Sequence, residues 1–377
     1  MNENVKSVQI SGIRKFYNEV VKVKDAISLT LGQPDFNTPN CIKEEMKKAI
    51  DEDKTTYTPN AGIIQLREEI SKYLKTLNIN YSKEDICITV GGSEGLYSVF
   101  QSLVNPGENV LIPTPAYPAY ESIVKIIGGK VFNYKLNEDF SLNIEEIKRS
   151  LDESNSKILV LSFPTNPTGA ILDKEGRDKL IKLIKDREII VITDEIYASI
   201  IYDDYYSIAQ EDEILDKVIY ISGFSKMFSA TGLRIGYVCA KKDLMNEIMK
   251  VHQYGVSCAT SIVQYGMISG LKNGLSEVDK MKQEFKNRRD FVCERLTKMG
   301  LEHTVPKGAF YVFPSIKKFN LSSYEFCRKL LNEEKVACVP GDAFGEGGEG
   351  YIRISYCYSI EELKLALDKI EDFIKRL

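Results

Sequence analysis

Residues 188–197 have the sequence EIIVITDEIY, in which an apolar, β-branched run ends directly at Asp194. Continuous apolar runs of this kind are typical of strands that are buried on both faces of a sheet. Four similar runs occur elsewhere: DICITV (85–90), ENVLIP (108–113), KILVLSF (157–163) and KVIYIS (217–222). Segments with helical spacing, such as residues 144–154 and 174–186, lie between them. This alternation predicts an α/β fold with a mostly parallel sheet.

The character of the chain changes after about residue 275, where a long charged helix is followed by short strands and a closing helix. We therefore predict a large domain at 46–275 and a smaller α+β domain at 276–377. Residues 1–45 should form an N-terminal segment that packs on the small domain and the active site. The glycine-rich stretch at 341–350 is too short for a linker, and we expect an exposed loop there.

The composition excludes several classes of protein. The chain has 50 basic and 54 acidic residues, and this negative balance argues against a nucleic-acid partner. Its two histidines, His252 and His303, belong to no metal-binding motif, so we expect structural histidines and no metal site. The eight cysteines are scattered singly, as in reduced cytoplasmic proteins. The first residues contain no apolar leader, and no apolar run could span a membrane, so we expect a cytoplasmic location.

Candidate site residues follow the five runs directly. In an open parallel sheet, ligands bind outside the carboxyl ends of the strands. The residues at these positions are GGSEG (91–95), PTPAY (113–117), PTNP (164–167), DEIY (194–197) and GFSK (223–226). Together they supply a small-residue turn, aromatic rings, an amide, an acid and a lysine at one edge of the predicted sheet.

The motif GGSEGL (91–96) follows a strand and begins a helical segment, a setting in which backbone N–H groups and the helix dipole bind phosphate. It matches neither GxGxxG nor GxxxxGK[ST], which disfavours a dinucleotide or a P-loop nucleotide. The Glu94 carboxylate would repel a phosphate, so only its backbone N–H would serve. An ordinary glycine turn remains the alternative.

Three charged residues stand in apolar surroundings. Asp194 at the end of a buried strand needs a partner, and it is either a helix cap or the counter-ion of a protonated heterocycle. Desolvation of Lys226 would lower its pKa and make the amine nucleophilic. Arg234 has a similar apolar context, suited to holding a phosphate.

The segments SGFSKMFSATGLRIGY (222–237), FPTNPTG (163–169) and TDEIY (193–197) resemble the signatures of the class I/II aminotransferases. These are fold-type I enzymes that use pyridoxal 5′-phosphate (PLP), with a large αβα-sandwich domain and a smaller α+β domain. The resemblance covers essentially the whole chain, from LTLGQPDFNTP (29–39) to GYIRISY (350–356).

The runs SGIRKF (11–16) and VHQYGVSCATSI (251–262) are most similar to bacterial N-acetyl-LL-diaminopimelate aminotransferases of lysine biosynthesis, whose close relatives are commonly labelled aspartate aminotransferases. The resemblance implies transfer of an amino group between an L-amino acid and a 2-oxo acid, with glutamate and 2-oxoglutarate as one pair. An aspartate or aromatic, broad-specificity enzyme stays open as an alternative.

For the cofactor ring, the resemblance implies roles for five residues. Lys226 would hold PLP as a Schiff base and then move the proton between the substrate Cα and the cofactor C4′. Asp194 would pair with the pyridine nitrogen. Asn166 and Tyr197 would hydrogen-bond the ring O3′, and Tyr117 would stack on the ring.

The resemblance also implies binding groups for the phosphate: the backbone N–H groups of Gly92, Ser93 and Glu94, the charge of Arg234, and a hydroxyl of Ser222 or Ser225. Many relatives have serine where this chain has Gly223, so the choice between the two serines stays open. For the substrate, Arg353 would clamp the α-carboxylate, with Asn166 beside it and Gly32 approaching through its backbone.

Tyr57 resembles a tyrosine that reaches the partner's phosphate, which implies a homodimer with shared active sites. Arg14 and Lys15 could read a distal carboxylate of the substrate, although basic pairs on amphipathic helices are usually solvated. A C–S or β-lyase with the same cofactor is a rival activity. A PLP-binding regulator would need a DNA-binding domain before Leu29, and a dehydrogenase would need a dinucleotide fingerprint.

Overall fold

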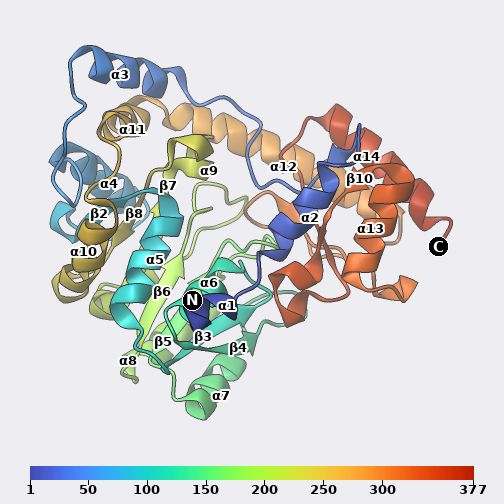
Figure 1. Cartoon of the computed structure of the whole chain (residues 1–377), viewed down its shortest axis with the longest axis horizontal. Helices are drawn as coiled ribbons and strands as arrows, with labels where there is room; N and C mark the ends of the chain where they lie inside the picture. The colour runs from blue at the N-terminus through green and yellow to red at the C-terminus, as the bar shows by residue number, and fades with distance from the viewer.

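A computed structural model describes the whole chain, residues 1–377, and its centre is a seven-stranded sheet (Figure 1). The strand order is β2-β8-β7-β6-β5-β3-β4. The strands are β2 (Ile86–Thr89), β3 (Asn109–Thr114), β4 (Lys130–Lys135), β5 (Ile158–Ser162), β6 (Ile190–Asp194), β7 (Val218–Gly223) and β8 (Gly236–Cys239). β8 is antiparallel to both of its neighbours, β2 and β7, and all other pairs are parallel, which confirms the predicted mostly parallel sheet.

Helices cover both faces of this sheet, so the large unit has three layers, αβα (Figure 1). One face carries α5 (Gly91–Leu103), α6 (Ala119–Ile126) and α10 (Lys242–Val256). The other carries α4 (Ile64–Thr76), α7 (Ile144–Ser154), α8 (Lys174–Lys185) and α11 (Ser261–Asn273). On β5, Val160 packs with the first group and Leu159 with the second. Because both faces are covered, the strand needs apolar residues at every position.

The C-terminal residues form a smaller α+β unit, orange and red in Figure 1. Its elements are α12 (Leu275–Lys298), β9 (Tyr311–Val312), α13 (Ser323–Glu334), β10 (Val336–Ala337), β11 (Val339–Pro340), β12 (Ile352–Ser355) and α14 (Ile360–Ile374). The N-terminal segment joins this unit, because α2 (Gly12–Val20) adds Phe16 and Val20 to its core and β1 (Ile27–Ser28) pairs with β10.

The predicted boundary at residue 45 falls inside another helix, α3 (Asn40–Asp51). This helix packs against α11, and Ile42 belongs to the core of the large unit. The packing therefore favours a large unit that begins before α3 rather than at residue 46.

The glycine-rich stretch at 341–350 is not the exposed loop that we expected. It forms two short 3-10 helices, η6 (Gly341–Phe344) and η7 (Glu346–Gly348), against the end of β3. The Ala116 N–H donates to the Phe344 carbonyl at 2.9 Å, and the Gly347 N–H donates to the Thr114 hydroxyl at 3.0 Å. A Cβ on Gly347 would lie 2.9 Å from the Thr114 carbonyl, so glycine permits this close contact between the two units.

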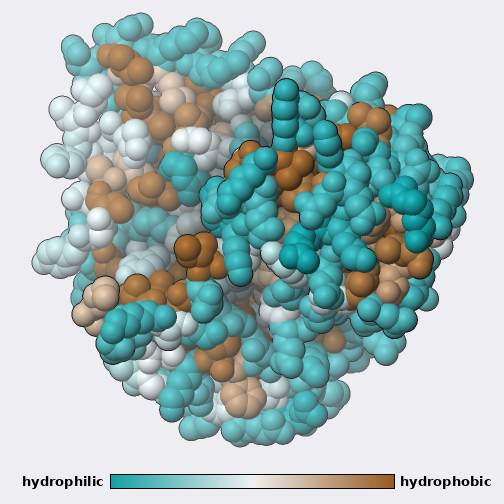
Figure 2. Space-filling model, turned by 45° about the vertical axis from the view of Figure 1, so that its right-hand side comes forward, coloured by the Kyte–Doolittle hydropathy of each residue, from teal (hydrophilic) through white to brown (hydrophobic).

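The face in Figure 2 is mostly hydrophilic, with hydrophobic residues in small separate groups. No helix of the chain combines the length and the apolar composition needed to cross a bilayer.

The layered core predicts a stability difference between two leucines. Leu159 is fully buried on the central strand β5, whereas Leu365 on α14 is 52% exposed. We expect Leu159→Ala to lower the free energy of unfolding by about 2–5 kcal/mol, because it leaves a cavity. Leu365→Ala should change it by about 0.5 kcal/mol or less. Chemical unfolding followed by circular dichroism checks both, and equal effects would contradict the assigned layers.

Candidate active site

A cavity of about 460 Å³ lies at the carboxyl ends of the central strands, between the large unit and the small unit. The α/β connections, the N-terminal segment and the small unit all contribute to its walls. The structure brings these predicted site residues together in its lining: Gly32, Gly92, Ser93, Tyr117, Asn166, Asp194, Tyr197, Ser225, Lys226, Arg234 and Arg353. Of the predicted residues, four do not line it: Tyr57, Glu94, Ser222 and Lys15.

The position of Asp194 follows from the sheet register. It is the last residue of β6 and lies opposite Ser162 on β5 and Ile221 on β7. Its carboxylate accepts hydrogen bonds from the Tyr120 hydroxyl at 2.8 Å and from the Ile196 N–H at 3.2 Å. Burial raises the pKa of Asp194 to about 6, against the opposing effect of these hydrogen bonds. A cationic partner in the cavity would stabilise the ionised form.

Lys226 belongs to the short helix α9 (Phe224–Met227), which directly follows β7. Its amine donates to the Gly32 carbonyl at 2.6 Å. Burial lowers the pKa of Lys226 to about 8, and the positive charges of Arg234 and Arg353 act in the same direction. The amine is therefore a much better nucleophile and base near neutral pH than an ordinary lysine.

Arg353 on β12 is almost wholly buried, and its partners are neutral oxygens. It donates to the Asn166 amide oxygen at 2.8 Å and to the Thr30 carbonyl, while its Nε has no partner. The guanidinium carbon lies 4.4 Å from the ring centre of Tyr311. A buried cation with an unused donor and only neutral partners is suited to an anionic ligand such as a carboxylate.

The first turn of α5 lies beside Arg234. Gly91 has a φ of +75°, and a Cβ there would lie 2.7 Å from the Arg234 Nη2, so the guanidinium rests directly on this glycine. Gly92 and Ser93 follow in the cavity wall, at the N-terminus of a helix of 13 residues. Free N–H groups, the helix dipole and the guanidinium together favour a phosphate.

The other residues that were predicted to bind the phosphate differ in position. Ser225 lines the cavity, whereas the Ser222 hydroxyl donates to the Glu195 carbonyl at 3.1 Å. The Glu94 carboxylate accepts bonds from the Val90 N–H and the Ser98 hydroxyl, as expected if only its backbone serves the site. Tyr57 is 88% exposed, so a role for it would require a second subunit.

Two tyrosines that the sequence analysis did not single out support the site. Tyr120 donates a hydrogen bond to Asp194. The sequence could have pointed to Tyr120, because it lies three residues after Tyr117 at the start of a helix. Tyr311 bonds the Tyr197 hydroxyl at 2.8 Å and lies under Arg353. A Cβ on Gly32 would lie 1.9 Å from the Tyr311 hydroxyl, so Gly32 must be a glycine. No sequence pattern marked Tyr311.

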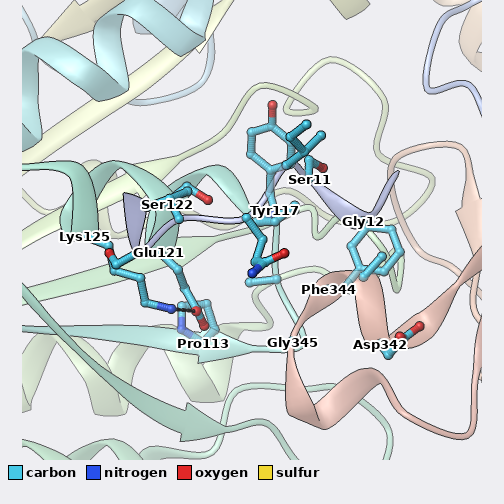
Figure 3. A pocket seen from close by; sticks show the side chains of 17 residues that line it. Ser11, Gly12, Pro113, Tyr117, Glu121, Ser122, Lys125, Asp342, Phe344 and Gly345 are labelled. Carbon is cyan, nitrogen blue, oxygen red and sulfur yellow. Dashed lines mark hydrogen bonds and ion pairs between the residues drawn. The ribbon is translucent and has the colours of Figure 1, made fainter. Parts of the chain in front are cut away.

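The N-terminal segment borders this cavity and a neighbouring one of about 230 Å³ (Figure 3). The second cavity lies between residues 7–12, α6 and η6, and it shares Ser11 and Tyr117 with the first. Arg14 on α2 lines the first cavity, whereas Lys15 does not. Of the two cations considered for a distal carboxylate, Arg14 is therefore the one with access to the site.

Comparisons with known proteins agree with this geometry. Residues 24–370 match the profile described as aminotransferase class I and II. The chain is 43% identical to a probable N-acetyl-LL-diaminopimelate aminotransferase of Bacillus subtilis (strain 168), over 99% of this chain and 95% of that protein. It is 40% identical to an aspartate aminotransferase of Pyrococcus abyssi, over 100% and 98% of the two chains.

A solved structure is also similar over nearly the whole fold. The crystal structure of an aromatic aminotransferase from Pyrococcus horikoshii OT3 superposes with a TM-score of 0.91 at 38% identity, covering 96% of this chain and 99% of that one. These proteins are named for different substrates, so the likeness covers the fold and the reaction class but not one substrate.

The burial of Lys226 predicts an unusual pH dependence of its reactivity. In ligand-free protein, we expect an amine-selective reagent to label Lys226 half-maximally near pH 8, because its pKa is lowered to about 8. Ordinary lysines have a pKa of about 10.4, so the exposed lysines provide the internal reference. Peptide mass spectrometry across pH measures each residue. Labelling of Lys226 in step with the exposed lysines would contradict its predicted environment.

Proposed function

Since the chain belongs to the class I and II aminotransferases, and is therefore a PLP-dependent aminotransferase of fold type I, we propose that it transfers amino groups between N-acetyl-LL-diaminopimelate and 2-oxoglutarate, with glutamate as the product amino acid. This reaction would serve lysine biosynthesis. The observation that carries the proposal is the convergence of three charged groups on one cavity: the half-buried Lys226 and the buried Asp194 and Arg353.

The residues present fit the cofactor. Asp194 offers a buried carboxylate for the protonated ring nitrogen, and its raised pKa indicates that it lacks a cation in the chain itself. Ser225, Arg234 and the first turn of α5 supply the phosphate site, and Tyr117 supplies a face for the ring. When bound, PLP supplies an electron sink that weakens the bonds at the substrate's α-carbon.

Residues of the chain would then transfer the proton at the substrate's α-carbon. Lys226 would hold the cofactor covalently and, once the substrate amine takes its place, act as the base and acid at the α-carbon. Its pKa of about 8 suits that exchange near neutral pH. Asn166 and Tyr197 would hydrogen-bond the ring oxygen and so tune its basicity, and the hydrogen bond between the Tyr197 and Tyr311 hydroxyls holds the Tyr197 phenol in place.

Arg353 would bind the α-carboxylate of the substrate in a bidentate pair, with Asn166 and the Gly32 backbone beside it. A substrate with a distal carboxylate would need a second cation, and we assign this role to Arg14. The guanidinium of Arg14 is exposed in the cavity wall, where its one close aromatic neighbour is Tyr17 at 5.7 Å.

We also propose a cytoplasmic homodimer in which Tyr57 completes the phosphate site of the partner subunit. The exposure of Tyr57 supports this proposal, since a large phenol in water is free to enter a second chain. The eight free cysteines, most of them buried, are in keeping with a reducing compartment.

The half-reaction with glutamate separates amino transfer from lyase chemistry. We expect one equivalent of glutamate to convert the enzyme's PLP to pyridoxamine phosphate and release 2-oxoglutarate without ammonia. Absorbance spectra and an ammonia assay measure the two outcomes. Release of ammonia or pyruvate from amino-acid donors, without pyridoxamine phosphate, would instead support a β-lyase.

Two arginine variants separate recognition of the two ends of the substrate. Arg353→Gln should lower kcat/KM by about 30-fold or more for every donor, because it removes about 2 kcal/mol or more of charge-paired binding. Arg14→Gln should affect N-acetyl-LL-diaminopimelate and aspartate but leave alanine and phenylalanine within about threefold. A donor panel with 2-oxoglutarate provides the data. If Arg14→Gln slows all donors equally, Arg14 does not read the side chain.

A further inference from the structure

His252 is buried completely on α10, although the reaction described above does not use it. Its Nδ1 lies 3.1 Å from the Glu94 carboxylate, in the first turns of α5. Its Nε2 lies 3.0 Å from the Asn60 backbone carbonyl, in the segment that carries Tyr57. One side chain therefore contacts both segments that are proposed to bind the cofactor phosphate.

These contacts determine the protonation state of the ring. A carbonyl oxygen only accepts hydrogen bonds, so Nε2 must carry a proton. Nδ1 faces a carboxylate whose two oxygens already accept bonds from the Ser98 hydroxyl at 2.6 Å and the Val90 N–H at 2.9 Å. Burial acts to lower the pKa of His252, but interactions with Cys87 and Glu94 outweigh burial and raise the pKa. The two ring contacts are those of an imidazolium that pairs with the Glu94 carboxylate.

The pair matters because of where Glu94 stands. It directly follows Ser93 in the turn that offers N–H groups to the phosphate, and its carboxylate also holds the Val90 N–H in front of that turn. Without a counter-ion, a half-buried carboxylate here would repel a phosphate dianion and would itself be costly. The imidazolium removes this repulsion and leaves Glu94 free to fix the turn.

The contact with Asn60 extends the same network to the segment that carries Tyr57. The Asn60 amide donates to the Ser257 carbonyl at 2.6 Å, just beyond the end of α10. Gln264 on α11 donates to the Thr58 hydroxyl at 3.0 Å. The segment that carries Tyr57 is thus tied to α10 and α11, with His252 as the link that also reaches α5.

We propose that His252 is a positioning residue for the cofactor phosphate: as an imidazolium it neutralises Glu94 and holds the first turn of α5 and the Tyr57 segment in one arrangement. This inference rests on the proposed phosphate site at the start of α5.

The first test measures the charge of His252 in the intact holoenzyme. The chain has two histidines, so ¹⁵N-histidine spectra contain two rings, and a His303→Gln variant assigns them. We expect His252 to show protons on both ring nitrogens at pH 7. A neutral ring for His252 would overturn the proposal, and this measurement needs no substitution at the buried site.

The second test compares the affinity of the full chain, freed of cofactor, for PLP and for pyridoxal, which lacks the phosphate. We expect His252→Asn to weaken PLP binding by about tenfold or more, a loss of about 1.4 kcal/mol, and to change pyridoxal binding by less than about twofold. His252→Asn/Glu94→Gln should recover most of the PLP affinity, because it removes the unpaired carboxylate together with the imidazolium.

The control is Arg234→Gln, which removes a charge from the proposed phosphate site itself. If Arg234→Gln weakens PLP relative to pyridoxal but His252→Asn does not, the role of His252 is wrong and the phosphate site stands. If neither variant distinguishes PLP from pyridoxal, the phosphate site is wrong and the inference falls with it. Equal loss of both ligands in the double variant would mean that His252 supports only the fold.

Discussion

The register of β5, β6 and β7 is the constraint on which the site depends. It places the Asp194 carboxylate at the end of a central buried strand, where it is only 6% exposed and where Tyr120 and a backbone N–H are its hydrogen-bond partners. A nearby cation would stabilise the ionised form of a carboxylate in this position. Lys226 and Arg353 place two cationic groups in the same cavity, so the cavity suits a ligand that carries both signs of charge.

The second requirement is that the small unit approach the sheet closely. Arg353 lies far from Asp194 in the sequence and reaches Asn166 because η6 and η7 dock on the end of β3. Gly347 allows that contact, and Gly32 allows the close approach of the Tyr311 hydroxyl, whose ring packs against Arg353. The close packing at these two glycines therefore helps to place the residues that would bind the substrate.

Much of this arrangement could be predicted from the sequence, because buried parallel strands and the residues after them form a local pattern. Thus the residues after β2, β5, β6 and β7 were found directly. Strand β4 was not predicted, since it is an edge strand with several exposed residues, and β8 was not predicted because it begins at a glycine, a residue that is rare in strands. Tyr311, the docking of residues 341–350 and the buried pair of His252 with Glu94 depend on contacts between distant segments, which no local pattern encodes.

Borohydride reduction of the purified holoenzyme, followed by peptide mapping, tests the central claim most directly, because it makes the cofactor's bond to its lysine permanent. The account predicts one modified peptide per chain, carrying the pyridoxyl group on Lys226. A pyridoxyl group on any other lysine, or none on the reduced protein, would contradict the assignment of Lys226 and with it the site built around Asp194 and Arg353.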